Sequence, residues 1–372
     1  MTKLKVLLAG GGTAGHTSPL IATAEALLKI DPEIKITCIG TAKGLETTVI
    51  PAAGLDLQLI SPVPLPRRLT IDLLKLPWRL KQAVNQAATI IQTTNAQVIV
   101  GFGGYVSLPA YLAARRLHRR IVIHEQNALP GLANKIAARF ADAVLTSLPG
   151  TPLAKAQLVG LPLRSGITEL ASQGRAARRQ QARLKYGLPV TTPVLLVSGG
   201  SQGAQSINEA TVAARDQLLA AGLSIVHVWG ANKFPAGIEP IERAGAHYLP
   251  IDYVADMASA YAAADLMLAR SGAATVAETA SVGLPCLFVP FPHGNGEQRR
   301  NALPLIEAGG GLMISDSDLT PERLLAEVLP LLGDDKRLLS IGQVAQTVIQ
   351  PGAAERVATS ILALIDQTEA AK

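Results

Sequence analysis

Three short apolar runs in this chain each end in a glycine-rich turn, and this repeated pattern limits the possible folds more than any other feature. The runs occupy residues 6–9, 97–100 and 194–197, and the turns that follow them read GGGTAGH at 10–16, GFGG at 101–104 and GGSQG at 199–203. Glycine permits a tight turn and lets a ligand approach the backbone amides at a helix N-terminus. Each run therefore predicts a strand that passes through a phosphate or sugar-phosphate binding turn into a helix.

Strands and helices alternate along the rest of the chain. Further strands are predicted at 34–39, 121–124, 225–229, 266–269 and 286–289, and helices at 19–28, 45–53, 108–116, 257–264 and 353–365. Such alternation favours parallel sheets covered by helices on both faces. The pattern breaks in a polar, basic stretch after residue 164 and restarts at 194.

We therefore predict an α/β protein with two doubly wound, Rossmann-like domains that face each other across a ligand-binding cleft. The first comprises residues 1–163 and the second residues 164–351. The last helix, within 352–372, follows a Pro-Gly break and could pack on either domain; we assign it to the first.

The amino-acid composition limits the cellular location and the binding partners that can be expected for this protein. Hydrophobic residues make up 48% of the 372 residues and charged residues 17%, which is typical of a globular protein. The net charge of +6 favours an anionic partner, but aromatic residues are only 3% of the chain, which argues against nucleic acid. Cys38 and Cys286 lie in predicted core strands, so we expect inert thiols in a reducing compartment. Because no signal peptide or long apolar span is apparent, a cytoplasmic location is expected.

The first turn resembles a dinucleotide-binding fingerprint, since Gly10, Gly12 and Gly15 have the G-x-G-x-x-G spacing. That fold normally places an acidic residue at the end of the second strand, but here the strand ends Cys-Ile-Gly-Thr at 38–41. A dehydrogenase is therefore disfavoured. The chain also lacks a G-x-x-x-x-G-K-[ST] motif and a cluster with metal-ligand spacing, so neither cofactor nor metal is predicted. A stimulatory divalent ion stays an open question.

Seven motifs in a fixed order resemble the MurG family of bacterial N-acetylglucosaminyltransferases. They read GGGTAGH, GFGGYVS, HEQN, GLPLR, GGSQGA, RSGAATVAE and GLPCLFVPF, and they extend over almost the whole chain. The resemblance implies a GT-B fold and inverting transfer of N-acetylglucosamine from UDP to the 4-hydroxyl of N-acetylmuramic acid on lipid I. The product, lipid II, is the peptidoglycan precursor, which connects the enzyme to cell-wall biogenesis, cell shape and cell division.

Several residues suit this chemistry. His16 ends the first turn and has a side chain suited to general base catalysis, although it could equally cap the turn; Glu125, at a strand end, is the rival base. Ser201 and its turn offer donors to a diphosphate, and Arg164 could pair with a phosphate. Thr275 and Glu278 share one helix face, where a carboxylate can accept both ribose hydroxyls.

The resemblance assigns the remaining site residues. It implies UDP-N-acetylglucosamine binding by Thr13, Ala14, Gly15, Asn127, Arg164, Ser201, Val254, Ala273, Ala274, Thr275, Val276, Ala277, Glu278 and Gln298. Gly12, Gly103, Gly104 and Tyr105 are expected in turns that face the acceptor pyrophosphate. Glu297, beside Gln298, departs from relatives that carry glutamine there.

The implied acceptor is a membrane lipid, so we expect a peripheral protein on the cytoplasmic face of the cell membrane. Residues 65–81 mix leucines and Trp78 with five basic residues, as interfacial segments do, and the basic residues at 115–120 could add charge. The alternative for 65–81 is a buried crossover helix with a basic edge. Two rival functions are a UDP-N-acetylglucosamine 2-epimerase and a non-catalytic nucleotide-sugar or lipid-binding module.

Overall fold

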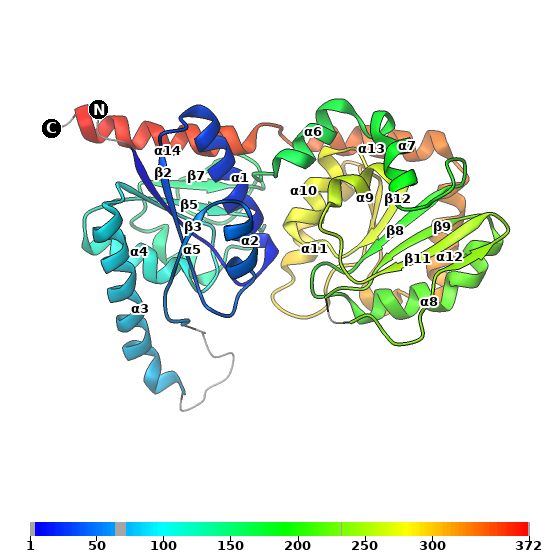
Figure 1. Ribbon diagram of the computed structural model, residues 1–372, viewed down its shortest axis with the longest axis horizontal. Coiled ribbons are helices and arrows are strands. Elements are labelled where there is room, and N and C mark those ends of the chain that lie inside the picture. The colour runs from blue at the N-terminus through cyan, green and yellow to red at the C-terminus, as the bar shows by residue number, and fades with distance from the viewer. Residues whose placement is uncertain (1–3, 64–71, 232, 371–372) are drawn as a thin grey trace. The chain divides into compact units, whose positions relative to one another are not determined.

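The structure is a computed structural model that describes the backbone of residues 4–63, 72–231 and 233–370, and their side chains except at 72–74 and 366–370 (Figure 1). The chain divides into two compact units. Unit 1 comprises Met1–Arg164 and Gly352–Lys372, and unit 2 comprises Ser165–Pro351.

Unit 1 is built on a seven-stranded sheet with the order β3-β2-β1-β4-β5-β6-β7, and its neighbouring strands are parallel. Its strands are β1 Lys5–Ala9, β2 Lys35–Gly40, β3 Asp56–Leu59, β4 Val98–Gly101, β5 Arg120–Glu125, β6 Ala143–Thr146 and β7 Ala156–Leu158. Its helices are α1 Ala14–Ile30, α2 Glu46–Ala52, α3 Asp72–Thr94, α4 Ser107–Arg116, α5 Leu132–Ala137 and α14 Ala353–Ala370. The strand order reverses between β1 and β4, which is where doubly wound sheets bind ligands. The first two glycine turns follow these two strands.

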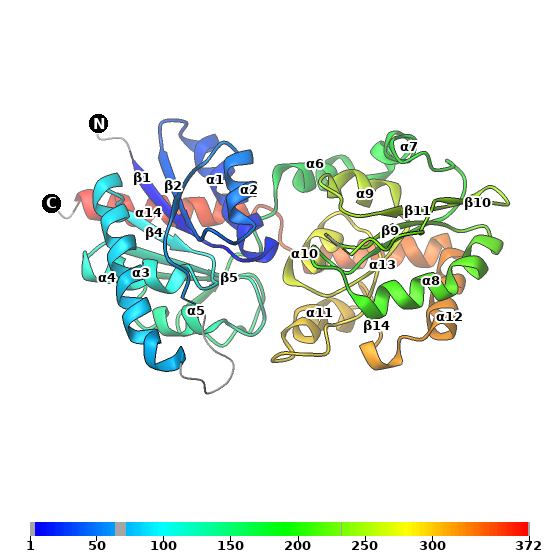
Figure 2. The ribbon, with the colours of Figure 1, turned by 60° about the horizontal axis from the view of Figure 1, so that its bottom comes forward.

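The sheet of unit 1 is buried on both faces, as the side chains of strand β1 show. Val6 and Leu8 pack in one core, whereas Leu7 and Ala9 pack in a second core on the opposite face. Because successive side chains of a strand alternate between faces, an unbroken apolar run suits a strand that is covered on both sides. Helices α1 and α14 cover one face, and α3 and α4 cover the other (Figure 2).

Unit 2 repeats this design with the strand order β10-β11-β9-β8-β12-β13-β14, in which only β10 and β11 pair antiparallel among the described strands. Its strands are β8 Val194–Ser198, β9 Ser224–Val228, β10 Ile241–Arg243, β11 Ala246–Ile251, β12 Leu266–Ala269, β13 Cys286–Phe288 and β14 Leu312–Met313. Its helices are α6 Ser165–Gln173, α7 Arg175–Lys185, α8 Gln205–Ala220, α9 Met257–Ala263, α10 Ala273–Ser281, α11 Glu297–Glu307, the short η1 Asp316–Asp318, α12 Pro321–Leu332 and α13 Asp335–Val348. The order reverses between β8 and β12, so the third glycine turn and the RSG sequence at 270–272 lie beside this second reversal. The prediction of two doubly wound α/β halves is confirmed.

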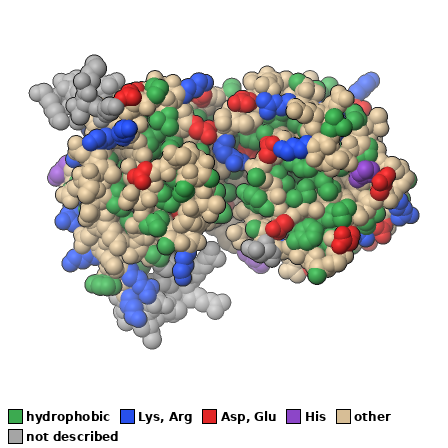
Figure 3. Space-filling view, in the orientation of Figure 1, with side chains coloured by type: hydrophobic (Ala, Val, Ile, Leu, Met, Phe, Trp, Pro, Cys, Tyr) green, Lys and Arg blue, Asp and Glu red, His purple; other side chains and the backbone are tan. Residues whose placement is uncertain are grey.

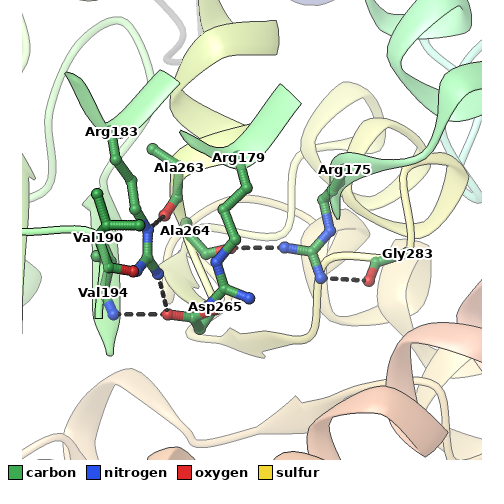
Figure 4. Close-up of polar contacts among 9 residues, drawn as sticks. All are labelled: Arg175, Arg179, Arg183, Val190, Val194, Ala263, Ala264, Asp265 and Gly283. Carbon is green, nitrogen blue, oxygen red and sulfur yellow. Dashed lines mark hydrogen bonds and ion pairs between the residues drawn. The ribbon is translucent and has the colours of Figure 1, made fainter. Parts of the chain in front are cut away.

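Arginines of α7 tie that helix to unit 2 (Figure 4). Arg183 is 1% exposed and donates to Asp265 at 2.7 Å, while Arg179 also pairs with Asp265. Arg175 donates to the carbonyls of Ala264 and Gly283, which follow the C-termini of α9 and α10. A cation at these ends suits the negative ends of the helix dipoles. The basic stretch that marks the domain boundary in the sequence therefore anchors α7 to the rest of unit 2, and we call Arg175, Arg179 and Arg183 the arginine clamp.

Some predicted bounds were wrong. Helix α1 begins at Ala14 rather than at Pro19, so Pro19 lies inside the helix, where it has no backbone N–H to donate. Helix α11, for which no bounds were predicted, begins at Glu297 after a left-handed Gly296. The two cysteines lie in β2 and β13 as predicted, and burial raises the pKa of Cys38 to about 12, which keeps this thiol protonated and unreactive.

One stretch, 335–365, is long and apolar enough to cross a membrane by length and composition alone, with a mean hydropathy of 1.2. In the structure it is two helices, α13 and α14, separated by a break at Pro351 and Gly352. Leu338 and Ile341 of α13 are buried in unit 2, whereas Val357 and Ile361 of α14 are buried in unit 1. These packed side chains account for its apolar character.

Candidate active site

His16 lies in the first turn of α1, directly after the first glycine turn. Its Nδ1 is 3.1 Å from the Gly11 carbonyl oxygen and 3.2 Å from Thr13 Oγ1. A carbonyl oxygen only accepts hydrogen bonds, so Nδ1 carries the proton of the neutral ring and Nε2 has the lone pair. Burial lowers the pKa of His16, and the charge of Glu125 and the Gly11 carbonyl oppose this change only in part. The imidazole is therefore arranged as a neutral base at Nε2.

The second glycine turn packs against this imidazole. Gly103 has a φ of 88°, and a β-carbon there would lie 3.3 Å from His16 Nε2. Gly104 has a φ of 80°, and a β-carbon there would lie 2.8 Å from the Gly11 carbonyl oxygen. Glycine is required because both the left-handed backbone and the close approach exclude a side chain. The structure thus brings together the turns that were predicted separately, and Tyr105 follows them with its ring 48% exposed.

Glu125 ends β5 and is 2% exposed. Its Oε1 accepts a hydrogen bond from the Asn127 backbone N–H at 3.0 Å, and its Oε2 accepts from the Gly131 N–H at 3.0 Å and the Asn134 side-chain amide at 2.9 Å. The carboxylate therefore organises the loop between β5 and α5. It also holds the backbone of Asn127, which is one of the predicted donor-site residues and has a half-buried side chain.

Asn134 and Tyr111 belong to this site although the motif analysis did not select them. Both are buried, and the Tyr111 hydroxyl donates to Asn134 Oδ1 at 2.9 Å. Burial and the nearby Glu125 charge raise the pKa of Tyr111, so it stays a neutral donor. A β-carbon at Gly101 would overlap this ring. The only sequence signal was a polar asparagine in a short helix that follows the HEQN motif.

In unit 2 the third glycine turn follows β8 and leads into α8. Gly200 and Gly203 have φ values of 86° and 67°, and the turn is closed by a hydrogen bond from the Gly203 N–H to the Gly200 carbonyl. The Ser201 carbonyl accepts from the Ala231 N–H, and its side chain is half-buried. A β-carbon at Gly203 would overlap the Trp229 carbonyl, so this turn packs directly on the end of β9.

Helix α10 holds six predicted donor-site residues. Ala273, Ala274 and Thr275 form its half-buried first turn, whereas Val276 and Ala277 point into the interior. Glu278 is also buried, and its Oε2 accepts a hydrogen bond of 2.7 Å from the buried Tyr261 hydroxyl. Glu278 is therefore an interior side chain and not an exposed acid on the helix surface.

Arg270 connects the loops around the switch point of unit 2. It donates to the Val289 and Pro290 carbonyls and to Ser206 Oγ, and it forms an ion pair with Asp316. These partners belong to the ends of β13, α8 and η1, so one guanidinium fixes several loops at once.

The remaining predicted residues come from three separate segments of the chain. Gln298 Oε1 accepts from the Phe291 N–H at 3.0 Å, which orders the segment before α11. Val254 is buried between β11 and α9. Arg164 is the last residue of unit 1, and its buried Nε has no hydrogen-bond partner among the described residues. No cluster of three metal-ligating side chains occurs in the part of the chain that the structure describes.

Comparison with known proteins identifies two family domains in the chain. The N-terminal domain of glycosyltransferase family 28 matches residues 6–146, and the C-terminal domain of that family matches residues 194–357. A solved structure of MurG from Acinetobacter baumannii has a TM-score of 0.74 and 29% identity, covering 96% of this chain and 99% of that one. A putative UDP-N-acetylglucosamine 2-epimerase from Listeria monocytogenes has a TM-score of 0.69 at 15% identity, covers 99% of this chain and 98% of its own, and shares only the fold.

The sequence relatives are much closer. The UDP-N-acetylglucosamine–N-acetylmuramyl-(pentapeptide) pyrophosphoryl-undecaprenol N-acetylglucosamine transferase of Cutibacterium acnes is 56% identical over 363 residues, which is 96% of this chain and 97% of that protein. The GT-B fold expected from the motifs is confirmed. The chain therefore belongs to the family of UDP-N-acetylglucosamine–N-acetylmuramyl-(pentapeptide) pyrophosphoryl-undecaprenol N-acetylglucosamine transferases, within glycosyltransferase family 28.

Proposed function

We propose that this protein transfers N-acetylglucosamine from UDP-N-acetylglucosamine to the 4-hydroxyl of N-acetylmuramic acid on lipid I and so forms lipid II. The observation that carries this proposal is the 56% identity to a transferase of that name over nearly the full length of both chains. The arrangement of His16 adds a chemical reason, because a glycosyl transfer needs a base for the acceptor hydroxyl.

In the proposed reaction, His16 Nε2 takes the proton of the acceptor hydroxyl while its oxygen attacks the anomeric carbon of the donor sugar. The bond from that carbon to the UDP oxygen breaks, its electron pair leaves with UDP, and the configuration inverts. The Gly11 carbonyl accepts the Nδ1–H throughout, and the Glu125 charge stabilises the imidazolium that forms. The proton therefore ends on His16, the sugar on the acceptor oxygen, and the electron pair on UDP.

Glu125 is the weaker candidate for the base. Both of its carboxylate oxygens already accept hydrogen bonds from the loop that follows β5, including those of Gly131 and Asn134. Taking up a proton would weaken these bonds inside the unit. We therefore assign Glu125 to positioning, and His16 to proton transfer.

Unit 2 is proposed to bind the donor. The Ser201 turn and the first turn of α10 present backbone dipoles to the diphosphate. Arg164, which directly precedes unit 2 in the chain and has an unpartnered Nε, is proposed to pair with a phosphate. Glu278 is proposed to accept the ribose hydroxyls, with Val254 near the uracil and Gln298 near the sugar. A metal is not needed for this assignment, and the effect of divalent ions is part of the assay below.

The role of Glu278 is tested by Glu278→Gln. A charged hydrogen bond contributes about 1.5–3 kcal/mol, so we expect UDP binding to weaken about 10- to 100-fold by isothermal titration calorimetry. Glu209→Gln, on the exposed face of α8, is the matched control. Equal UDP affinity of the Glu278→Gln protein and the wild type would contradict the assignment.

A single assay separates the transferase from its rivals. The protein is incubated with UDP-N-acetylglucosamine, with and without a lipid I analogue, and each arm is repeated with EDTA and with Mg²⁺. UDP release that requires the acceptor supports the transferase. Epimer formation without an acceptor would instead identify the epimerase, and the absence of both products would leave a binding module.

Contact with the cytoplasmic face of a membrane is proposed for the first part of α3. Figure 3 shows lysine and arginine side chains over this end of unit 1. Trp78 is 69% exposed beside the exposed Lys75 and Lys81, whereas Ala87 and Ile91, further along the helix, are buried. Within the segment 65–81, Leu76 and Leu80 pack against the core of unit 1, as in a crossover helix, whereas Lys75, Trp78 and Lys81 are exposed. The segment 65–71 lies outside the described residues.

Three nearby arginines also hydrogen-bond within unit 1. Arg116 donates to Asn85 of α3 at 3.0 Å, which places it beside that helix. Arg119 donates to Asn95, and Arg120 pairs with Asp142 at 2.6 Å. The basic cluster at 115–120 therefore stabilises unit 1 as well as adding charge.

The membrane proposal is tested with the triple variant Trp78→Ala, Lys75→Glu, Lys81→Glu. Each basic contact near an anionic surface contributes about 1 kcal/mol, so we expect binding to vesicles with anionic headgroups to fall at least about tenfold in a sedimentation assay. The matched control is Leu339→Ala, Lys336→Glu, Arg337→Glu on the exposed face of α13. Equal losses in both variants would show a general charge effect and overturn the proposed surface.

A further inference from the structure

Glu46 is a buried carboxylate beside the first glycine turn that has no part in the site as described so far. It is the first residue of α2 and is 0% exposed. A charged group removed from water requires strong compensating hydrogen bonds. The groups that donate hydrogen bonds to Glu46 therefore indicate its role.

Three donors converge on this carboxylate. Oε2 accepts the Gly12 N–H at 2.8 Å, and Oε1 accepts both the N–H and the hydroxyl of Thr41 at 2.9 Å. Gly12 belongs to the turn after β1, and Thr41 directly follows β2. Glu46 thus links the ends of two neighbouring strands.

Three glycines make room for the carboxylate. A β-carbon at Gly11 would lie 2.5 Å from Glu46 Oε1, and one at Gly40 would lie 2.5 Å from its Cγ. A β-carbon at Gly44 would overlap the carboxylate even more closely. Real β-carbons essentially never approach this near. The backbone on three sides is therefore shaped around this side chain.

A dinucleotide-binding fold places an acid here to bind ribose hydroxyls. No acidic residue lies at the end of β2, but Glu46, at the start of α2, binds the backbone of the chain itself. While it accepts the Gly12 N–H, a phosphate cannot use that amide. The predicted pyrophosphate contact through Gly12 would require this bond to break.

We propose that Glu46 is the positioning residue of the first glycine turn and that it holds His16 in its catalytic orientation. The connection is short: Glu46 binds the Gly12 N–H, and the carbonyl of the adjacent Gly11 accepts the Nδ1–H of His16. If the turn moves, that carbonyl moves and Nε2 changes direction. The expected effect of Glu46 on the transfer rate rests on the proposed function, whereas its effect on the structure of the glycine turn does not.

The first test measures the turn without any reaction. In Glu46→Gln one carboxylate oxygen becomes an NH₂ and the other loses its charge, so the Gly12 N–H either loses its acceptor or keeps only a weaker, neutral hydrogen bond. We expect amide hydrogen exchange of the peptide that contains Gly12 to accelerate at least about tenfold in the full-length protein. Unchanged exchange overturns the proposal whatever the enzyme does. Glu25→Gln, on an exposed part of α1, is the matched control.

The second test is a double-mutant cycle on the transfer rate. Because a small misplacement of a catalytic group can cost about 10²-fold, we expect Glu46→Gln to lower kcat by about that factor with little change in KM for UDP-N-acetylglucosamine. In a His16→Ala background the same substitution should change kcat less than about twofold. A full additional loss in that background would show that Glu46 acts independently of His16 and would overturn the proposal.

Two controls keep the outcomes distinguishable. If the wild type releases no UDP in the presence of the acceptor, the proposed function fails, while the exchange experiment still decides the role of Glu46 in the turn. If Glu46→Gln does not fold, as judged by thermal unfolding, Glu46→Asp keeps the charge but shortens the reach and replaces it in both experiments. Wild-type exchange in a folded Glu46→Asp protein would then overturn the proposal.

Discussion

Replacing His16 with alanine should lower the rate of N-acetylglucosamine transfer by about 10²- to 10⁴-fold, which is the usual contribution of a general base. The neutral imidazole has its proton on Nδ1, held by the Gly11 carbonyl at 3.1 Å, so only Nε2 can take the acceptor proton. Alanine removes that lone pair and leaves the turn and the donor unit intact. The loss should therefore appear in kcat, with UDP affinity unchanged.

The pH dependence follows from the direction of the pKa change. Burial lowers the pKa of His16 below its usual value, so the ring becomes neutral at a lower pH than a histidine in water. Only the neutral ring can act as the base. The rate should rise with pH through this lowered pKa and level off at a lower pH than it would for a histidine in water, and His16→Ala should remove that rise.

Steady-state assays with a lipid I analogue from pH 5 to 8 check both expectations, and His247→Ala, on β11 of unit 2, is the control for loss of a histidine. A His16→Ala enzyme within about tenfold of wild type would exclude His16 as the base. Glu125 would then return as the candidate, although both of its oxygens accept hydrogen bonds.

Replacing Asp265 with alanine should destabilise unit 2 by about 3–5 kcal/mol, because it removes one partner of a buried ion pair. Asp265 accepts from Arg183 at 2.7 Å and from the Val194 N–H at 2.8 Å, and it also pairs with Arg179. Without it, the fully buried Arg183 cation lies in the interior of the protein without a counter-charge, and the first amide of β8 loses its acceptor. Both losses add to the cost.

Urea unfolding followed by fluorescence of Trp229 measures this effect in unit 2. The matched control is Asp216→Ala, whose pair with Arg215 lies at the surface and should change stability by less than about 1 kcal/mol. A loss at Asp265 no larger than the loss at Asp216 would show that the arginine clamp contributes little to folding.

The sequence by itself determined the local elements and the family. Apolar runs followed by glycine turns predicted β1, β4 and β8, because a buried strand and a left-handed turn each need particular residues at adjacent positions. The same local chemistry indicated His16 at the end of a glycine turn and Glu125 at the end of a strand, whereas Glu278 was indicated by its helical spacing from Thr275. The ends of the elements were predicted less accurately than the elements themselves, because α1 begins at Ala14 and not at residue 19.

Only the tertiary structure decided which distant residues meet. The strand order places β4 beside β1, and this brings Gly103 against His16 across more than eighty residues of chain. It also shows that Glu125 is bound by Asn134 and that Glu46 is bound by Gly12. These contacts depend on sheet order and on the close approach of loops, neither of which leaves a periodic signal in the chain. An isolated glutamate near a turn therefore looks like any surface acid until the fold surrounds it with donors.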